Sequence, residues 1–568
     1  MIKNLFTENA LTVLHDRYLW RKSKRNVETP EEMLKRVAKH VAGPSKQLEK
    51  RFLLALSELA FLPNSPTLMN AGKKQAQLAA CFVLPLADDL TEIMNTLKST
   101  ALIHQSGGGT GFSFSSLRPE KSQVQSSNGV AAGPLGFLSL FNELTQTIKQ
   151  GGLRRGANMG VLSVEHPDIE AFIHCKTDIS KITNFNISVA VTNKFINAVK
   201  NDSSWNLIDP HTRKKVKTVS ASKLFQDICE AAWLTGEPGL IFIDEINKNN
   251  PTPKKGIMEA TNPCGEQPLL PYEACNLGSI NLNVIYQKNN SDSINWSKLS
   301  ELTETGVLFL DRVIDTCTYP VPEIHDLCHA NRKIGLGVMG FADLLLKLNI
   351  AYGSPESYVV GEKIMEFIRT QAVLVSQQLA KKHGAFDGFS QSLWNKRGLK
   401  PLRNATLTTI APTGTISLLC NASAGIEPIF SYAYERHVLD KKILREVHPY
   451  AEAVLKERGL YNESLLKIMS QEGTFKDASI PDDIKNIFVT TRDLTATQHV
   501  EMQARFQKHS DSGVSKTINL SNKASVQDVQ VAFMLAAKLK CKGITIYRDG
   551  TRPDQVLQLK NCPDCTRI

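Results

Sequence analysis

The chain is organised around one short stretch, Thr261-Asn262-Pro263-Cys264-Gly265-Glu266-Gln267-Pro268, in which an amide and a carboxylate flank a cysteine at two-residue spacing. In an extended backbone, side chains two residues apart point to the same side. We therefore expect Asn262, Cys264 and Glu266 to face one ligand together. The prolines and the glycine of the stretch favour a tight turn over a helix. A buried loop with a structural cysteine would have the same residues, so the rest of the chain must decide between these interpretations.

The composition is that of an ordinary soluble globular protein, with 568 residues, 42% hydrophobic and 22% charged. No linker interrupts the chain, which predicts one large domain with additions at its ends. Residues 1–26 lack the apolar core and the cleavage site of a signal peptide. No apolar run approaches the roughly 20 residues that a membrane span needs. We expect a cytoplasmic protein that does not bind membranes.

The charge balance is basic, with 67 Lys and Arg against 56 Asp and Glu. This balance suits polyanionic ligands, but the basic residues form no dense stripe on any expected helix, so we do not expect a nucleic acid partner. The eleven cysteines are odd in number and irregularly spaced. In a cytoplasmic protein they indicate redox or catalytic use more than a disulfide framework.

Two of these cysteines, Cys562 and Cys565, form a C-x-x-C motif near the end of a polar tail, residues 549–568. We expect this tail to be mobile. A structural zinc site would need two further ligands, and the sequence has no second C-x-x-C. A dithiol that opens and closes is therefore the better interpretation.

Short strands alternate with longer helical stretches, which predicts a largely parallel α/β sheet or barrel. Apolar spacing and capping residues predict helices from Pro30, from Leu90 to near Ser106, and from Pro134. Residues 430–500 are expected to be helical and charged. The expected strands are residues 77–84, 112–117, 181–192, 239–244, 331–340, 406–410, 516–520 and 543–548.

Three loops have the composition of ligand-binding segments. Residues 106–111 hold four glycines, which let a backbone approach a ligand closely, although a tight turn explains them equally well. The Arg154-Arg155 loop has anion-binding capacity, or is a solvated charge pair. Residues 412–415 follow a strand and precede a helix, so their N–H groups and hydroxyls favour phosphate binding over an ordinary turn.

Together these motifs give the chain a specific resemblance to a known family. In order, they are Asn64-Ser65-Pro66-Thr67, Ala80-Cys81, residues 106–114, 151–160, Asn262-Pro263-Cys264-Gly265-Glu266, residues 411–417 and 515–520, Tyr547-Arg548-Asp549-Gly550 and the final C-x-x-C. The chain resembles a ribonucleotide reductase catalytic chain, and most of all the adenosylcobalamin-dependent class II. The resemblance implies a ten-stranded α/β barrel of two five-stranded halves, with the Cys264 loop as a finger through its middle.

The same resemblance implies three regions. Residues 1–60 would be an N-terminal helical region without the ATP-binding cone that controls overall activity in many relatives. Residues 61–548 would form the catalytic barrel, with a specificity site and with dimer helices beginning near Leu90 and Pro134. Residues 549–568 would be a mobile redox tail.

The chemistry implied by the resemblance begins at Cys264, which would carry a transient thiyl radical and take the 3′ hydrogen from the ribose. This requires a dry interior, because water and mobile groups would destroy the radical. Glu266 would accept the proton of the 3′-hydroxyl, and Asn262 would hold the sugar. Adenosylcobalamin would be the cofactor that generates the radical.

Two further cysteines, Cys81 and Cys275, would supply two electrons as the 2′-hydroxyl leaves as water, and would close to a disulfide. That bridge requires their α-carbons to lie within roughly 7 Å. Cys562 and Cys565 would reduce it by thiol–disulfide exchange, and thioredoxin or a similar dithiol protein would restore the tail.

The resemblance also assigns binding residues. Asp88 and Arg118 would bind a deoxynucleotide effector that sets substrate choice. The chain would form a homodimer, and its ribonucleotide substrate would be a diphosphate. The implied substrate site consists of Ser65, Ala80, Cys81, Gly109, Asn262, Pro263, Cys264, Gly265, Glu266, Pro412, Thr413, Gly414, Thr415 and Ile416.

Two alternatives stay open. The same reaction could take its radical from a separate metalloprotein subunit instead of from cobalamin. A catalytically silent nucleotide-binding relative is the other alternative, although such a protein has no need for the reactive cysteines.

Overall fold

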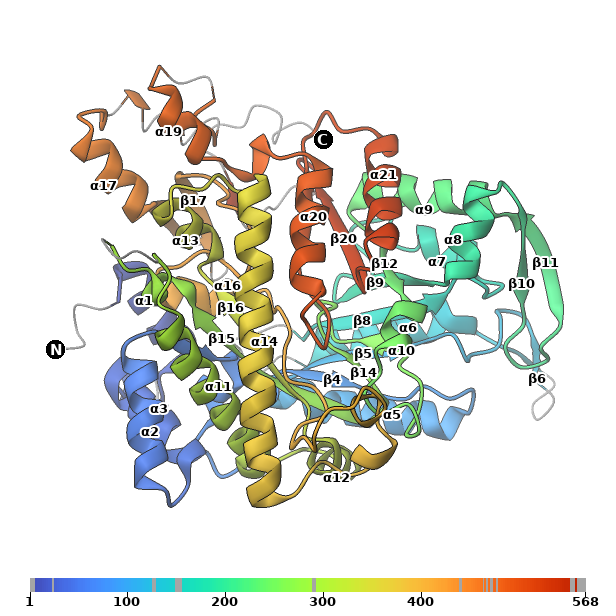
Figure 1. Cartoon of the computed structure of the whole chain (residues 1–568). Coiled ribbons are helices and arrows are strands. Elements are labelled where there is room, and N and C mark those ends of the chain that lie inside the picture. Colours follow the sequence, from blue (N-terminus) through green and yellow to red (C-terminus); the bar gives the residue numbers. More distant parts are fainter. Residues whose placement is uncertain are drawn as a thin grey trace.

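The structure is a computed structural model, and it describes residues 6–22, 25–124, 129–148, 156–288, 293–438, 442–462, 464–465, 468–469, 473–476, 479–551 and 557–558. Four residues with expected roles, Arg154, Arg155, Cys562 and Cys565, lie outside the described residues. Figure 1 shows a layer of long helices over a strongly twisted sheet. Within the described ranges, no helix is both long and apolar enough to cross a membrane.

The N-terminal region is mainly helical, as expected, and forms the blue part of Figure 1. Thr29 begins the helix at Pro30 through a capping box, because its hydroxyl accepts from Glu32 N at 3.2 Å while Glu32 accepts from Thr29 N at 2.7 Å. The elements are α1 (Glu8–Val13), η2 (Leu14–Tyr18), β1 (Arg21–Lys22), β2 (Arg25–Asn26), α2 (Pro30–Ala42), α3 (Lys46–Ser57), β3 (Phe61–Pro63) and α4 (Ser65–Asn70).

One half of the barrel is a run of five parallel strands in the order β4-β5-β8-β9-β12. The strands are β4 (Cys81–Val83), β5 (Gly109–Ser113), β8 (Asn158–Ser163), β9 (Phe185–Val191) and β12 (Gly239–Phe242). The helices that connect and cover them are α5 (Leu90–Ser106), α6 (Gly133–Thr147), α7 (Ile169–His174), α8 (Asn193–Lys200), α9 (Ala221–Thr235) and α10 (Ile243–Lys248). The helices expected from Leu90 and near Pro134 are confirmed.

The other half contains β15 (Glu273–Asn281), β16 (Ile334–Met339), β19 (Thr517–Leu520) and β20 (Gly543–Arg548), and residues 406–410 lie between β16 and β19. That segment bridges both neighbours in parallel, through Leu336 with Thr408 and through Ile410 with Val514. The halves meet antiparallel, at β4 with β15 and at β12 with β20. This arrangement confirms the ten-stranded barrel of two five-stranded halves.

Helices cover the second half from outside, and α14 crosses the whole front face in Figure 1. They are η3 (Leu282–Ile285), α11 (Trp296–Thr316), α12 (Pro322–Asn331), α13 (Phe341–Lys347), α14 (Pro355–His383), η4 (Phe389–Gln391), α15 (Leu393–Lys396), α16 (Gly414–Leu419), α20 (Ala496–Gln507) and α21 (Val526–Lys538). Every residue of β15 and β16 is buried, as expected for strands covered on both faces.

Three expectations of secondary structure were wrong in part. The strand expected at 112–117 begins earlier, because Gly109 and Gly111 belong to β5 and not to a loop. Residues 406–410 make only isolated bridges instead of a continuous strand. Residues 430–500 hold helices α17 (Pro449–Glu457) and α19 (Asp482–Ile487) and the turn η5 (Thr491–Asp493), but also strands β17 (Ala433–Val438) and β18 (Lys442–Val447), which form a sheet with β21 (Leu557–Gln558).

Two small strand pairs lie outside the barrel. They are β6 (Gln123–Val124) with β7 (Gly129–Val130), and β10 (Ser204–Ile208) with β11 (Lys215–Ser220).

Candidate active site

The Cys264 stretch forms the tip of a hairpin between β13 (Ala260–Thr261) and β14 (Pro268–Leu269). A turn closes the tip, because Gly265 N donates to Asn262 O at 3.1 Å. The tight turn expected from the prolines and the glycine is therefore confirmed, whereas a continuously extended backbone is not. Asn262 and Glu266 are each 2% exposed, whereas Cys264 is exposed at the tip. We call residues 260–269 the finger hairpin.

Strand β5 holds one side of the finger hairpin through its glycines. A Cβ at Gly111 would lie 1.7 Å from the carbonyl oxygen of Thr261, and a Cβ at Gly109 would lie 2.8 Å from Cγ of Pro263. No side chain can occupy the Gly111 position unless one of the two backbones moves. The glycine-rich sequence at 106–111 thus permits a close approach, but the neighbour is this chain's own hairpin.

The other side of the hairpin is fixed by hydrogen bonds to its main chain. Glu266 O accepts from Gly513 N at 2.7 Å and from Thr409 Oγ1 at 3.0 Å. Pro263 O accepts from Asn186 Nδ2 at 2.8 Å. Local sequence patterns did not single out these three contacts, because each joins residues at least 77 positions apart.

Cys81 and Cys275 are direct partners across the seam where β4 meets β15. Both are buried and both are thiols without a disulfide. Asn262 Nδ2 donates to Cys81 Sγ at 3.1 Å, which connects the finger hairpin to this cysteine pair. Burial raises the pKa of the Cys81 thiol well above its usual value, and the charges of Glu266, Cys275 and Cys264 raise it further. The fold therefore brings the three cysteines and the carboxylate into one region.

Glu266 is a buried carboxyl with unused hydrogen-bonding capacity. Its Oε2 atom has no hydrogen-bond partner among the described residues. Burial raises the pKa of Glu266 to about 7, and hydrogen bonds from Asn262 and from the Glu266 backbone oppose that shift. A carboxyl with this pKa can accept or hold a proton at neutral pH, as a general base must.

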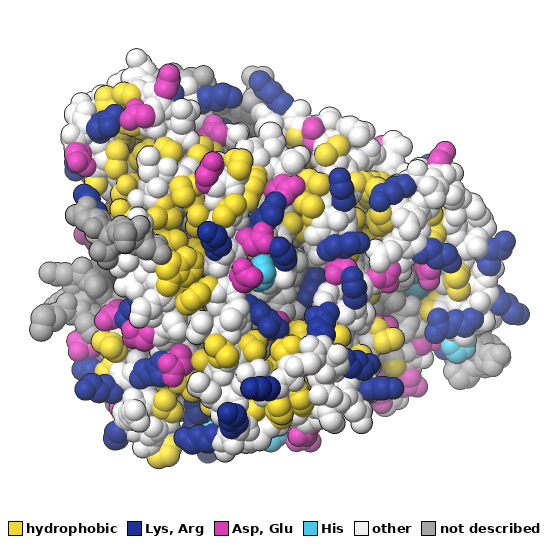
Figure 2. All heavy atoms as spheres, in the orientation of Figure 1, with side chains coloured by type: hydrophobic (Ala, Val, Ile, Leu, Met, Phe, Trp, Pro, Cys, Tyr) yellow, Lys and Arg dark blue, Asp and Glu magenta, His cyan; other side chains and the backbone are white. Residues whose placement is uncertain are grey.

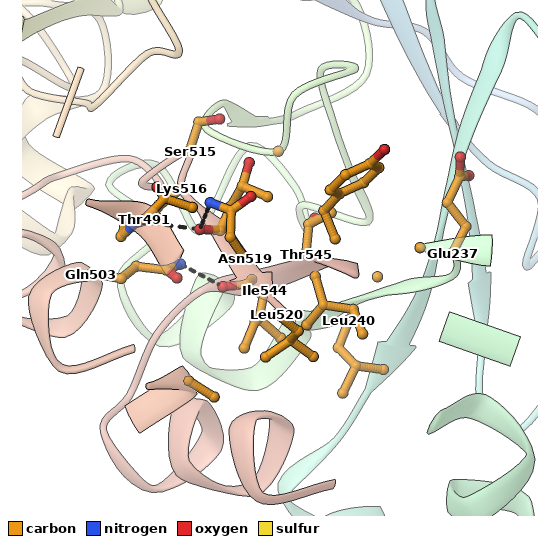
Figure 3. Close-up of a pocket in the computed structure, with 18 of the residues that line it drawn as sticks. Glu237, Leu240, Thr491, Gln503, Ser515, Lys516, Asn519, Leu520, Ile544 and Thr545 are labelled. Atoms are coloured by element: carbon orange, nitrogen blue, oxygen red, sulfur yellow. Dashed lines mark hydrogen bonds between the residues drawn. The ribbon is translucent and has the colours of Figure 1, made fainter. Parts of the chain in front are cut away.

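A large cavity of about 1210 Å³ adjoins the tip of the finger hairpin. Figure 3 shows its wall of side chains from β12, β19 and β20, among them Leu240, Asn519, Leu520, Ile544 and Thr545. Lys516 lies on the same wall, where its Nζ donates to Glu427 at 2.6 Å and contacts His499 Nδ1 at 3.0 Å.

Cys264 opens into this cavity. The dry interior expected around Cys264 is therefore not found, because this cysteine is exposed, whereas Cys81 and Cys275 are both buried.

The expected substrate residues fall into two groups. Pro263, Cys264, Gly265 and Pro412 line the cavity. Ala80 packs against the cluster that contains Cys81 and Cys275, and its carbonyl oxygen accepts from Gly109 N at 2.9 Å.

Two more parts of the expected substrate site are anchored elsewhere. Ser65 contacts the hydroxyl of Tyr18 at 2.7 Å. Thr413 has a left-handed backbone with φ of 55°, and its hydroxyl accepts from Gly425 N at 2.7 Å. Gly414, Thr415 and Ile416 begin α16, so the expected turn into a helix is present there.

Asp88 and Arg118, the expected effector residues, lie together. Arg118 Nε donates to Asp88 Oδ2 at 2.8 Å, and both side chains are about one-fifth exposed. His211 Nδ1 lies 3.8 Å from the same carboxylate oxygen. Asp88 precedes α5 and Arg118 follows β5, so the pair sits at one end of the first barrel half.

Comparisons with known proteins agree with this geometry. Residues 79–547 match the family model described as ribonucleotide reductase, barrel domain, and residues 4–76 match ribonucleotide reductase, all-alpha domain. The chain is 50% identical over 508 residues to a vitamin B12-dependent ribonucleoside-diphosphate reductase of Thermoplasma acidophilum, covering 89% of this chain and 66% of that relative. It is 44% identical over 559 residues to a Mycobacterium tuberculosis protein of the same name, covering 96% of this chain and 80% of the relative.

A solved structure shares the fold. The class Id ribonucleotide reductase alpha subunit of Actinobacillus ureae superposes with a TM-score of 0.79 and 24% sequence identity, covering 96% of this chain and 98% of the other. The family models together span most of the chain, and the mycobacterial relative is similar over nearly all of it. The chain therefore belongs to the ribonucleotide reductase family.

Proposed function

We propose that this chain reduces ribonucleoside diphosphates to 2′-deoxyribonucleotides by a thiyl-radical mechanism that adenosylcobalamin initiates. The observation that carries this proposal is the placement of Cys264, Glu266 and Asn262 on one hairpin against the Cys81–Cys275 pair. The names of the Thermoplasma and mycobacterial relatives support the cofactor and the diphosphate substrate.

In the proposed reaction, the Cys264 thiyl radical takes the hydrogen atom from C3′ of the ribose. Glu266 accepts the 3′-hydroxyl proton, since its raised pKa makes it a base of suitable strength near neutral pH. Asn262 holds the sugar through its amide. The 2′-hydroxyl then leaves as water with a proton from the thiol pair.

The electrons for this step come from Cys81 and Cys275. Together they give up two electrons and two hydrogens, of which one leaves in the water and the other goes to C2′, and they end as a disulfide, while Glu266 returns its proton to the 3′ oxygen. Cys264 finally returns a hydrogen atom to C3′. The high pKa that burial imposes on the Cys81 thiol keeps it protonated until the step needs its hydrogen.

The cavity beside Cys264 fits the cofactor that we propose. Its volume of about 1210 Å³ exceeds the 300–1,000 Å³ typical of pockets for drug-sized ligands. Asn519, Ser521, Asn522 and Thr545 would hold the amide-bearing rim of the cofactor by hydrogen bonds, and apolar side chains such as Leu520 would contact its ring. When bound, adenosylcobalamin supplies the carbon-centred radical that oxidises the Cys264 thiol.

The finer partner assignments are part of the same proposal. A deoxynucleotide effector would bind at Asp88 and Arg118. Thioredoxin or a similar dithiol protein would reduce the tail cysteines, and the protein would act in the cytoplasm. A homodimer would pair α5 and α6 with their copies, because both helices expose apolar side chains, namely Leu90, Met94, Leu102 and Leu140.

The deciding experiment measures deoxyribonucleotide formation by the purified chain with a ribonucleoside diphosphate, a small dithiol and adenosylcobalamin. Cys264→Ser should abolish product while nucleotide binding is retained, because the serine hydroxyl cannot form the radical. Cys175→Ser, at a half-buried thiol at the end of α7 and outside the site, is the control and should leave turnover in place. Turnover by Cys264→Ser would reject the radical assignment.

The same experiment also tests whether a separate metalloprotein subunit supplies the radical. Turnover without cobalamin that depends on an added metalloprotein subunit would favour that source and would leave the reaction unchanged. Nucleotide binding without turnover under any reductant would instead favour a silent relative.

A further inference from the structure

A second cavity, of about 760 Å³, lies on the outer side of the barrel, between α10, α14, α15, α20 and the segment that leads from α21 into β20. Six Lys and Arg residues line it against four Asp and Glu. Figure 2 shows Lys and Arg side chains near the middle of this face, with Asp, Glu and His side chains among them. None of the active-site residues described above lines this cavity.

The most buried cation of this cavity is Lys542, which is 6% exposed. Its Nζ donates to the carbonyl oxygens of Asp511 at 2.5 Å and Ser512 at 3.1 Å. An ammonium group has three donors, so one N–H remains without an acceptor among the described residues. No carboxylate of the described chain lies within 4.0 Å of Nζ. Buried charges are normally paired, so this site lacks an anion.

Two more cations on the wall are available to an anion. Arg397 donates to Asn249 Oδ1 at 3.1 Å and stacks 5.5 Å from the ring centre of Trp394, but it has no carboxylate partner in the described chain. Lys540 is exposed and has a left-handed backbone with φ of 61°, a conformation that usually selects glycine or asparagine after a helix. The chain therefore places a lysine where its backbone is strained, directly beside this cavity.

Among the described residues, the acidic side chains on the wall form no ion pair with these three cations, although Asp511 and Glu245 lie near enough to raise the pKa of Lys542. Asp511 is occupied by Arg369 at 3.2 Å, and Glu245 accepts from Asn249 at 2.9 Å. Glu501 lies 3.8 Å from Arg505, and Glu366 is exposed at the rim.

We propose that this outer cavity is a binding site for a phosphate-class oxyanion, either free phosphate or the phosphate of a small nucleotide, held by Lys542, Arg397 and Lys540. Lys542 supplies its unused N–H from the floor, and the other two close the site from the wall. Trp394 is 4% exposed and its ring is covered by the guanidinium groups of Arg369 and Arg397, so it offers no open face for a base. The phosphate group is therefore the part of the ligand that the cavity recognises.

The test measures phosphate affinity by isothermal titration calorimetry on the full chain. Because the substrate and effector sites also bind phosphates, the outer cavity is identified by comparing the phosphate affinity of the cavity variants with that of the wild type. We expect Arg397→Gln, Lys540→Gly and Lys542→Met each to weaken one class of phosphate site about tenfold, the loss typical of one charge-assisted hydrogen bond. Lys363→Gln, an exposed lysine of α14 outside the cavity, is the control and should bind as the wild type does.

The Lys540→Gly variant shows whether weaker phosphate binding could result from misfolding. Glycine relieves the strained backbone at this position, so the variant should keep or raise the unfolding temperature. A Lys540→Gly variant that is stable but binds phosphate about tenfold more weakly supports the site. Equal phosphate binding by the wild type and all three cavity variants overturns it.

The uptake of protons on binding distinguishes a direct contact between the anion and Lys542 from a general effect of the positive charge in the cavity. The pKa of Lys542 is lowered to about 8, chiefly by burial; Asp511 and Glu245 oppose this shift, and Arg397 and Lys333 add to it. A bound anion stabilises the ammonium form, so binding at pH 8.5 should take up a proton, measured as buffer-dependent heat. Lys542→Arg, which is always charged, should bind without this uptake. Proton uptake that persists in Lys542→Arg would overturn the role of Lys542.

The source of the anion follows from a parallel titration with a nucleoside 5′-monophosphate. A matched affinity for orthophosphate and the monophosphate, both lost in the cavity variants, identifies free phosphate as the ligand. A monophosphate affinity at least tenfold higher, again lost in the variants, identifies a nucleotide.

Discussion

Replacing Glu266 by Gln should change how the stability of the folded protein depends on pH. Burial raises the pKa of this carboxyl from its ordinary value of 4.5 to about 7. Between these values the folded protein keeps a proton that the unfolded chain releases, so stability falls as pH rises from 4.5 to 7 and stays low above 7. The full penalty is about 3 kcal/mol, and about 2.5 kcal/mol of it develops between pH 5 and pH 8.

Glutamine has nearly the same shape and no charge, so Glu266→Gln should remove this penalty. With an unfolding entropy of about 2 cal/mol/K per residue, the variant should gain about 2 °C in unfolding temperature over the wild type between pH 5 and pH 8. Calorimetric melts of both proteins at the two pH values measure this difference. Glu457→Gln, at an exposed carboxylate, is the control and should show no such gain.

An equal difference in unfolding temperature between Glu266→Gln and the wild type at both pH values would contradict this prediction. That result would mean that Glu266 is hydrated or paired in the folded protein. The same variant should lose turnover at every pH, because the amide cannot accept the 3′-hydroxyl proton.

Three further predictions concern the hairpin and the cysteines. Gly111→Ala should displace the finger hairpin, because the new methyl group would overlap the carbonyl oxygen of Thr261. The variant should have a turnover at least 100-fold lower than the wild type and a lower unfolding temperature. Full activity would show that the backbone of β5 can move to make room for the methyl group. Cys81→Ser should bind substrate but form no product with any dithiol, as binding and product assays would report. Replacing both Cys562 and Cys565 by Ser should spare a single turnover and stop repeated turnover with thioredoxin, and rapid-quench measurements that find the first turnover equally impaired would contradict the shuttle role.

The sequence predicted the elements that local patterns determine. The strand expected at 543–548 has the bounds of β20, and the helix expected from Leu90 to near Ser106 has those of α5. In both, the spacing of apolar residues and the flanking polar residues settle the conformation. The central stretch could be interpreted only together with the other motifs of the ordered set, because Asn262, Cys264 and Glu266 alone would also fit a buried loop with a structural cysteine.

What the sequence could not predict depends on neighbours that are distant along the chain. Gly109 and Gly111 were interpreted as a loop because four glycines in six residues usually form one, but they are strand residues that make room for the finger hairpin. Gly513 gave no signal of its own, and its importance lies in its contact with Glu266 O. The strands β17 and β18 were missed because a sequence with so many charged residues is also typical of exposed helices.

The seam between the two barrel halves would determine the structural effect of the proposed redox cycle. Partners on adjacent antiparallel strands have α-carbons about 4.5 or 5.5 Å apart, and a disulfide accommodates both separations. Cys81 and Cys275 can therefore join and part by rotation about their side-chain bonds while the strands keep their ladder. The oxidised and reduced proteins should have superimposable backbones, so the barrel can serve as an unchanging scaffold through many cycles.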